Sequence, residues 1–251
     1  MDNLQLWGSQ TAIKGFKNER DVAAKFNAWQ EDVDAQNWLK LMQYNLDDIK
    51  SVFATTKVPK KSKTDVQIQV TIHYKEAIDI QNLQVKLVSN GKSGFNQVDR
   101  RWVDKCCSDW NMTEEVASIL RYFAGEVPPN INKPKDSRRM FMNEFTSEQQ
   151  KLVIDWFEQN KAMIVCDILK GRGEFAAEWI LVAKIDGNKA EYMLRPINYY
   201  INVMGNGPVI ITARGSIKIH EITLQRKGGD GGRPSANQLQ FKVDPLLLFE
   251  K

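Results

Sequence analysis

The chain has little histidine and little cysteine. Its 251 residues include two histidines, His73 and His220, so a zinc hydrolase, a histidine–metal nuclease or a Ser-His-Asp hydrolase would need nearly all of them. Both lie in strand-like runs, and we expect ordinary β residues. Cys106, Cys107 and Cys166 are an odd number without metal-type spacing, which favours reduced thiols over a disulfide framework. Histidine-dependent hydrolysis and a disulfide framework are therefore disfavoured.

Long apolar runs and nucleotide-binding loops are also missing. No apolar run approaches the ~20 residues of a membrane-spanning helix, and the first ten residues lack the basic and apolar regions of a signal peptide. The glycine-rich segment 228–233 lacks the Gly-Lys-Ser/Thr ending of a phosphate loop. We therefore expect a cytoplasmic protein with no membrane segment, and nothing supports nucleotide binding.

The composition is that of an ordinary soluble globular protein, with 42% hydrophobic and 26% charged residues. A chain of this length forms either one domain or two compact lobes. The net charge of +4 is too small to indicate a nucleic-acid partner by itself. The basic residues are clustered, however, and the three clusters are Lys57, Lys60, Lys61 and Lys63; Lys133, Lys135, Arg138 and Arg139; and Arg226, Lys227, Arg233 and Lys242.

Residues 64–89 have the pattern of a β hairpin. Two runs rich in β-branched residues flank a short polar segment near Lys75, which predicts two antiparallel strands joined by a turn. This turn would set Asp65 opposite the stretch that contains Gln84 and Lys86, at ~5.5 Å between facing Cβ atoms. Because side chains alternate along a strand, Gln84 and Lys86 share one face and their leucine and valine neighbours the other. A carboxylate, an amide oxygen and an ammonium therefore converge.

These three groups are suited to phosphodiester hydrolysis. Oxygen ligands such as those of Asp65 and Gln84 suit Mg²⁺, which one or two carboxylates usually hold together with water and substrate phosphate. Lys86 would supply positive charge to the attacking water or to the phosphate. The alternative is the solvated face of an ordinary amphipathic hairpin, where the same residue types are common.

An amphipathic helix precedes the hairpin. Phe16, Val22, Ala23 and Phe26 recur at helical spacing, with Gly15 near the expected start. Glu19 would then lie in the first turns of this helix. It could point at the metal site, or it could be an acidic residue favoured there by the helix dipole.

A helix that leads into a hairpin with Asp65, Gln84 and Lys86 resembles the PD-(D/E)XK nuclease superfamily. Longer segments resemble monomeric type II restriction endonucleases that cut GCGC, and these segments are 15–19, 84–90, 94–97, 138–142, 171–179, 225–230 and 236–242. They span nearly the whole chain in order. Two positions depart from the superfamily pattern, because Thr64 replaces a proline and Gln84 replaces an acidic residue.

The resemblance implies a type II restriction endonuclease that is monomeric and depends on Mg²⁺. Asp65, Gln84 and Glu19 would hold the metal, and Lys86 would orient the water or neutralise the pentacoordinate phosphate. The implied substrate is double-stranded DNA containing GCGC, cut after the first G to leave 5′ overhangs. A separate DNA methyltransferase would protect host DNA. A junction-resolving or repair nuclease on the same fold and a noncatalytic DNA-binding module remain as alternatives.

The expected fold class is α/β, a mixed sheet with an αβββαβ core and a β-rich C-terminal lobe. Ser147 with Gln150 predicts a capped helix to Asn160, and residues 163–169 predict a short buried strand. Five later segments read as strands, namely 179–185, 191–194, 209–212, 216–224 and 238–243. We expect a catalytic lobe over residues 1–170 and a DNA-recognition lobe over residues 171–251.

Candidate DNA-binding residues come from two segments, one after the hairpin and one near the carboxyl end. Arg, Lys, Asn and Gln match purine edges in the major groove. Those near glycines or just beyond the catalytic strand are Asn96, Gln97, Arg100, Gln225, Arg226, Lys227, Arg233, Asn237, Gln238, Gln240 and Lys242. Lys61 and Lys63 precede Asp65 and would neutralise phosphate. A polar glycine-rich surface hairpin is the alternative for the later segment.

Overall fold

The computed structural model describes residues 3–56, 68–89, 96–228 and 233–250, with side chains from Ile13 onward. The chain forms two compact units that interleave in sequence. Unit A comprises Leu6–Gly94, Leu169–Tyr200 and Pro245–Lys251, and unit B comprises Met1–Gln5, Phe95–Ile168 and Ile201–Asp244. No helix among the described residues is long and apolar enough to cross a membrane.

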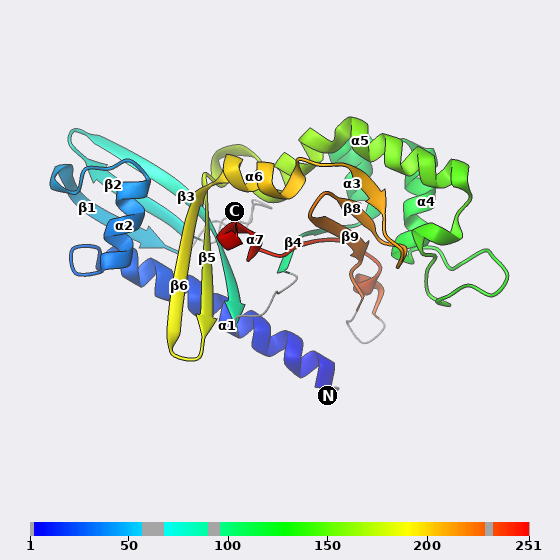
Figure 1. The fold of residues 1–251 in the computed structure, drawn as a ribbon, viewed down its shortest axis with the longest axis horizontal. Helices are drawn as coiled ribbons and strands as arrows, with labels where there is room; N and C mark the ends of the chain where they lie inside the picture. Colours follow the sequence, from blue (N-terminus) through cyan, green and yellow to red (C-terminus); the bar gives the residue numbers. More distant parts are fainter. Residues whose placement is uncertain (1–2, 57–67, 90–95, 229–232, 251) are drawn as a thin grey trace. The chain divides into compact units, whose positions relative to one another are not determined.

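Unit A contains a mixed five-stranded sheet in the order β1-β2-β3-β5-β6 (Figure 1). Its strands are β1 (Ile49–Thr55), β2 (Ile68–Tyr74), β3 (Ala77–Ser89), β5 (Trp179–Asp186) and β6 (Lys189–Pro196). Neighbours are antiparallel except β3 and β5, which are parallel. Helices α1 (Asn3–Asn27) and α2 (Val33–Leu41) pack on this sheet, and α7 (Leu247–Glu250) ends the chain. The predicted mixed α/β fold class is confirmed.

Aromatic side chains join the helices of unit A to its sheet. Phe26 of α1 and Trp38 of α2 have ring centroids 5.1 Å apart, and Trp38 meets Tyr192 of β6 at 5.3 Å. Leu83 and Val85 of β3 belong to the same buried cluster. Leu83 and Val85 therefore face the helices, as the alternation predicted.

The predicted hairpin is confirmed. Tyr74 pairs with Ala77 and Ile68 with Leu83, so β2 and β3 are antiparallel about a turn that contains Lys75. Lys75 has a left-handed φ of 51°, which completes the tight reversal.

Unit B contains an antiparallel five-stranded sheet in the order β4-β10-β9-β8-β7. Figure 1 labels β4, β8 and β9 of this sheet. Its strands are β4 (Asn96–Arg101), β7 (Val209–Ile211), β8 (Ile217–Ile219), β9 (Ile222–Arg226) and β10 (Leu239–Val243). Helices α3 (Val103–Trp110) and α4 (Glu114–Ala124) lie wholly in this unit, whereas α5 (Ser147–Lys170) and α6 (Ile197–Gly205) begin or end in unit A. Short 3₁₀ turns occupy Leu46–Asp48, Met142–Glu144, Gly173–Phe175 and Pro234–Ala236.

The prediction of a helix to Asn160 followed by a strand over residues 163–169 is wrong. Helix α5 continues to Lys170, so residues 163–169 are helical and the next strand is β5. A short apolar run fits a buried helix as well as a buried strand, and here the helix continues. The cap is also one residue earlier, because the Thr146 hydroxyl accepts from the Gln149 backbone and the Gln149 side chain accepts from the Thr146 backbone.

The predicted strand 216–224 is two strands, β8 and β9, separated by a turn. His220 lies in that turn with φ of 51°, so the expectation of an ordinary β residue is wrong for His220 and right for His73 in β2. Helix α4 runs from Glu114 to Ala124, with Gly125 as its left-handed cap. Residues 128–134 form a loop.

Gly125→Ala should destabilise the protein more than an ordinary glycine substitution. Gly125 has φ of +81°, and a Cβ there would lie 2.5 Å from the Arg138 carbonyl oxygen. The left-handed backbone alone costs an alanine ~1–2 kcal/mol, and the backbone clash should raise the loss to roughly 2–4 kcal/mol. Gly187, with φ of +57° and no atom near its Cβ position, is the matched control. Thermal unfolding should show the larger loss for Gly125→Ala, and equal losses would contradict the clash.

Candidate active site and nucleic-acid interface

The Gln84 amide is buried and has no hydrogen-bond partner in the part of the chain that the structure describes. Gln84 is 1% exposed, and neither its side-chain oxygen nor its nitrogen has a hydrogen-bond partner in the described part of the chain. An unsatisfied buried polar group costs about 1–3 kcal/mol. The burial of this amide therefore has to be explained by a role other than stabilising the fold.

Lys86 lies two residues further along β3, on the same face as Gln84, and is 7% exposed. Lysine is rarely so buried unless a charged group compensates it. Burial raises the pKa of the Glu19 carboxyl, and the positive charges of Lys86 and Arg20 oppose that rise. The structure therefore brings Glu19 of α1 and Lys86 of β3 within electrostatic reach of each other.

Glu19 does not lie in a first turn. Helix α1 begins at Asn3, not near Gly15, so Glu19 is in the helix interior and its position is not explained by the helix dipole. Asp65 lies outside the described residues. Within the described ranges, no three His, Cys, Asp or Glu side chains gather to hold a metal ion. The predicted metal ligands would not form such a cluster, because one of them is the amide oxygen of Gln84.

Asn82 is a residue of this face that the sequence analysis missed. Its side-chain Nδ2 donates to the carbonyl oxygens of Glu174 at 2.9 Å and Ala176 at 3.3 Å, and its backbone N–H donates to the Glu178 carboxylate at 3.0 Å. Asn82 thus ties β3 to the segment that precedes β5. The sequence does contain a signal for Asn82. Polar residues recur at every second position of this strand, at Asn82, Gln84 and Lys86, and therefore share one face.

The sheet of unit B has one polar face formed by strands β4, β9 and β10. Apolar side chains of these strands are buried, and the alternate residues form the other face. Predicted DNA-binding residues from both sequence segments meet on that face, namely Gln97, Arg100, Gln225, Gln240 and Lys242.

Three glutamines form a ladder across this face. The Gln225 Nε2 donates to Gln240 Oε1 at 3.4 Å, and the Gln240 Nε2 donates to Gln97 Oε1 at 2.6 Å. The ladder links neighbouring strands β9, β10 and β4 through their side chains. It holds the amide planes of the three residues in a defined relation.

Lys242 adds positive charge to the same face. Burial lowers the pKa of the Lys242 ammonium and is the sole cause of the shift. No described carboxylate compensates this partly desolvated ammonium, and such a group favours an anionic or electron-rich ligand.

The other predicted residues lie elsewhere. Arg226 faces inward and is 9% exposed, and its Nε donates to the Ala124 carbonyl at 3.1 Å while its terminal nitrogen donates to Asn237 Oδ1 at 2.6 Å. Period-two alternation after the inward Ile222 and Leu224 was the signal for this orientation. Asn96 is opposite the buried Val243, Lys227 pairs by its backbone with Gln238 at 2.7 Å, and Arg233 is exposed. Lys61 and Lys63 lie outside the described residues.

The mixed sheet, with helices on it and a second antiparallel sheet, is the restriction-endonuclease fold. The structure matches that of MspI restriction endonuclease in complex with its cognate DNA, with a TM-score of 0.67 and 14% identity, over 96% of this chain and 93% of that chain. The sequence model of the R.HinP1I restriction endonuclease family matches residues 42–249. No curated protein matches.

The protein is a type II restriction endonuclease, a site-specific deoxyribonuclease. It belongs to the R.HinP1I restriction endonuclease family. The predicted enzyme class is thereby confirmed.

Proposed function

We propose that this endonuclease hydrolyses double-stranded DNA at GCGC in a Mg²⁺-dependent reaction, cutting after the first G to leave 5′ overhangs. The single observation that carries the catalytic part is the buried Gln84 amide, which has no hydrogen-bond partner among the described residues and lies two residues from Lys86 on β3. The MspI structure contains cognate DNA, which supports DNA as the ligand. The GCGC site and cut position are supported by the sequence resemblance. We further propose a cytoplasmic monomer that acts with a separate methyltransferase.

The site residues fit a hard divalent cation. Restriction endonucleases generally use a divalent metal, and the Gln84 oxygen is a neutral donor that has no partner among the described residues. Gln84, with Glu19 and Asp65 as carboxylate donors, would hold Mg²⁺. The metal supplies a water of lowered pKa and charge stabilisation at the phosphate.

Lys86 and Glu19 have complementary tasks in this proposal. The Lys86 ammonium orients the attacking water or neutralises the oxygens of the pentacoordinate phosphate, where preorganised charge has its largest effect. The Glu19 carboxylate compensates the buried Lys86 before substrate binds. Asn82 holds β3 in place through its bonds to the segment before β5.

The polar face of unit B is the proposed base-reading surface. Arginine and lysine are suited to guanine O6 and N7, so Arg100 and Lys242 match a site of G·C pairs. The amides of Gln97, Gln225 and Gln240 both donate and accept, which suits the alternating donors and acceptors of such pairs. Arg226 and Asn237 support the β9–β10 hairpin, and Arg233, Lys227, Gln238 and Asn96 are peripheral contacts. Lys61 and Lys63 are proposed phosphate contacts.

Digestion of unmethylated plasmid tests the function. We expect discrete GCGC fragments with Mg²⁺, no cleavage with EDTA, and full recovery when Mg²⁺ is restored, because the Gln84 site requires a cation. The same plasmid methylated within GCGC is the control and should stay intact. Cleavage that prefers branched DNA would indicate a junction nuclease, and binding without cleavage under every metal condition would indicate a noncatalytic module. Cleavage that persists in EDTA would contradict the metal assignment.

A further inference from the structure

Strand β4 has a bulge where it pairs with β10. Asp99 lies opposite Phe241, but the next pair joins Gln97 to Lys242. Val98 is therefore an extra residue in β4. A one-residue bulge of this kind bends the strand and re-aims its side chains.

The bulge sets which side chains reach the polar face of unit B. Residues three apart in a regular strand point to opposite faces. Gln97 and Arg100 are three apart, yet both are exposed, while Val98 is 1% exposed and Asp99 is partly buried. The bulge therefore turns Val98 and Asp99 inward together and leaves Gln97 and Arg100 on one face.

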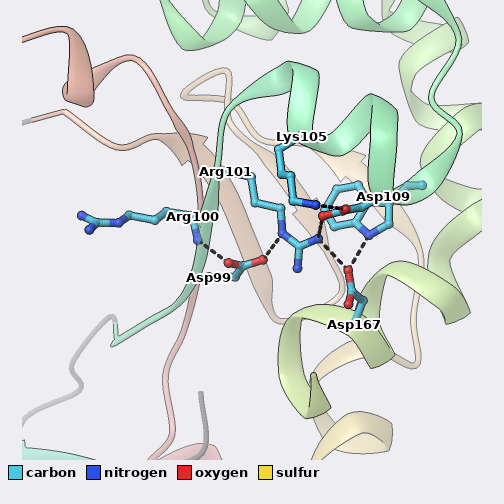
Figure 2. Close-up of polar contacts among 7 residues, drawn as sticks. Asp99, Arg100, Arg101, Lys105, Asp109 and Asp167 are labelled. Atoms are coloured by element: carbon cyan, nitrogen blue, oxygen red, sulfur yellow. Dashed lines mark hydrogen bonds and ion pairs between the residues drawn. The ribbon is translucent and has the colours of Figure 1, made fainter. Parts of the chain in front are cut away.

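The inward Asp99 carboxylate bonds to both residues that follow it. Its Oδ2 accepts from Arg101 Nε at 2.5 Å, and its Oδ1 accepts from the Arg100 backbone N–H at 2.7 Å (Figure 2). This pair of bonds fixes the backbone at Arg100. Figure 2 shows the Arg100 side chain directed away from the cluster that Asp99 and Arg101 form.

Arg101 is in turn held by two helices. A terminal nitrogen of its guanidinium donates to Asp109 at 2.8 Å and to Asp167 at 2.6 Å, and the guanidinium stacks on the Trp110 ring at 4.7 Å from its centroid. The Trp110 Nε1 also donates to Asp167, at 2.7 Å. Lys105 bonds to Asp109 at the edge of the cluster (Figure 2). The bulged end of β4 is thus anchored to α3 and α5.

Stability alone does not account for this cluster. Arg101 and Asp167 are 9% and 8% exposed, and desolvation of buried charges often cancels their attraction, so apolar replacements are frequently neutral or stabilising. Its geometry, however, has a specific consequence, because it places Arg100 beside Gln240 in the β4–β10 register.

We propose that Asp99 and Arg101 are positioning residues for base discrimination, which act by holding the Val98 bulge so that Arg100 and Gln97 face DNA together. The proposal rests on the reading surface of the proposed function. Both side chains are engaged in the buried cluster rather than on the polar face, so we expect their effect to pass through Arg100. This predicts an effect on the choice of sequence, beyond any effect on stability.

The test measures kcat/KM on a GCGC duplex and on a duplex with one base pair changed. Asp99→Asn and Arg101→Lys should each lower the ratio of the two values by about 10-fold or more, the loss typical of one base contact. Arg100→Ala should lower it similarly. In the Arg100→Ala background, Asp99→Asn should cause no further loss, because the two residues act as one unit.

Lys151→Met is the matched control. It removes an exposed cation from α5, the helix that supplies Asp167, and should leave the ratio unchanged. Rates that fall equally on both duplexes, or losses that add in the double variant, would overturn the positioning role. Asp99→Asn preserves shape and gives the result even where Arg101→Lys fails to fold. If Arg100→Ala loses discrimination but Asp99→Asn and Arg101→Lys keep it, only the positioning role is overturned. If the wild-type enzyme does not discriminate between the two duplexes, the proposed base-reading surface is overturned as well.

Discussion

Lys86→Ala should reduce DNA cleavage by roughly 10²- to 10³-fold or more while binding to the GCGC duplex is retained. Removal of one preorganised transition-state charge has an effect of this size. The ammonium acts on charge that develops at phosphate, so its loss lowers kcat more than ground-state affinity. Single-turnover cleavage and duplex binding in Ca²⁺ measure the two effects separately. Asp65→Ala should give the same pattern, since both residues serve the reaction step.

Lys184→Ala is the control for this substitution. Lys184 lies on β5, the neighbouring strand, and its ammonium forms a surface ion pair with Glu191 at 3.3 Å. Such pairs contribute ~0–1 kcal/mol to stability, so cleavage should stay at the wild-type rate. A Lys86→Ala protein that cleaves plasmid at that rate would remove Lys86 from the catalytic site.

The hairpin and its two faces could be predicted because they depend on local rules. A short turn fixes the register of β2 and β3. Alternation along β3 places Gln84 and Lys86 on one face. The convergence of Gln97 with Gln240 is less local, since they are joined only by tertiary pairing. Their chemical similarity, combined with the sequence resemblance, was enough to identify both as DNA-binding candidates.

The place of β5, the length of α5 and the bulge in β4 depend on tertiary contacts, which local sequence patterns do not contain. Strand β5 lies after residue 170, yet it pairs in parallel with β3 and completes the sheet that contains Gln84. Ile164 and Ile168 are buried at helical spacing within an apolar run that is equally compatible with a strand. The bulge at Val98 can be recognised only from the pairing of β4 with β10.

The two units distribute the proposed tasks between different sheets. Gln84, Lys86 and Glu19 belong to unit A, whereas the glutamine ladder and Arg100 belong to unit B. The charged cluster around Arg101 holds β4 in the sheet of unit B. The hydrogen bonds of Asn82 hold β3 in the sheet of unit A. Substitutions in one unit should therefore alter either the chemistry or the choice of sequence, and the paired measurements above separate these effects.

Gln84→Leu should abolish cleavage and at the same time stabilise the metal-free protein. The substitution removes two buried polar atoms that have no partners in the described part of the chain and fills the same volume with apolar atoms. Removing these unsatisfied groups should raise the free energy of unfolding by about 1–3 kcal/mol. Urea unfolding in EDTA measures the stability, and plasmid digestion with Mg²⁺ measures the activity. Gln84→Glu should instead keep cleavage, with an altered metal preference, because it restores an oxygen ligand.

Asn82→Leu is the matched control for stability, because Asn82 lies on the same strand and face but its amide is fully engaged. Its loss leaves the carbonyl oxygens of Glu174 and Ala176 without their donor, so this variant should be destabilised by about 1–3 kcal/mol. The two leucine substitutions are therefore expected to change stability in opposite directions. A Gln84→Leu protein that is as destabilised as Asn82→Leu would show that the Gln84 amide is satisfied in solution. One that digests plasmid normally would show that Gln84 holds no metal.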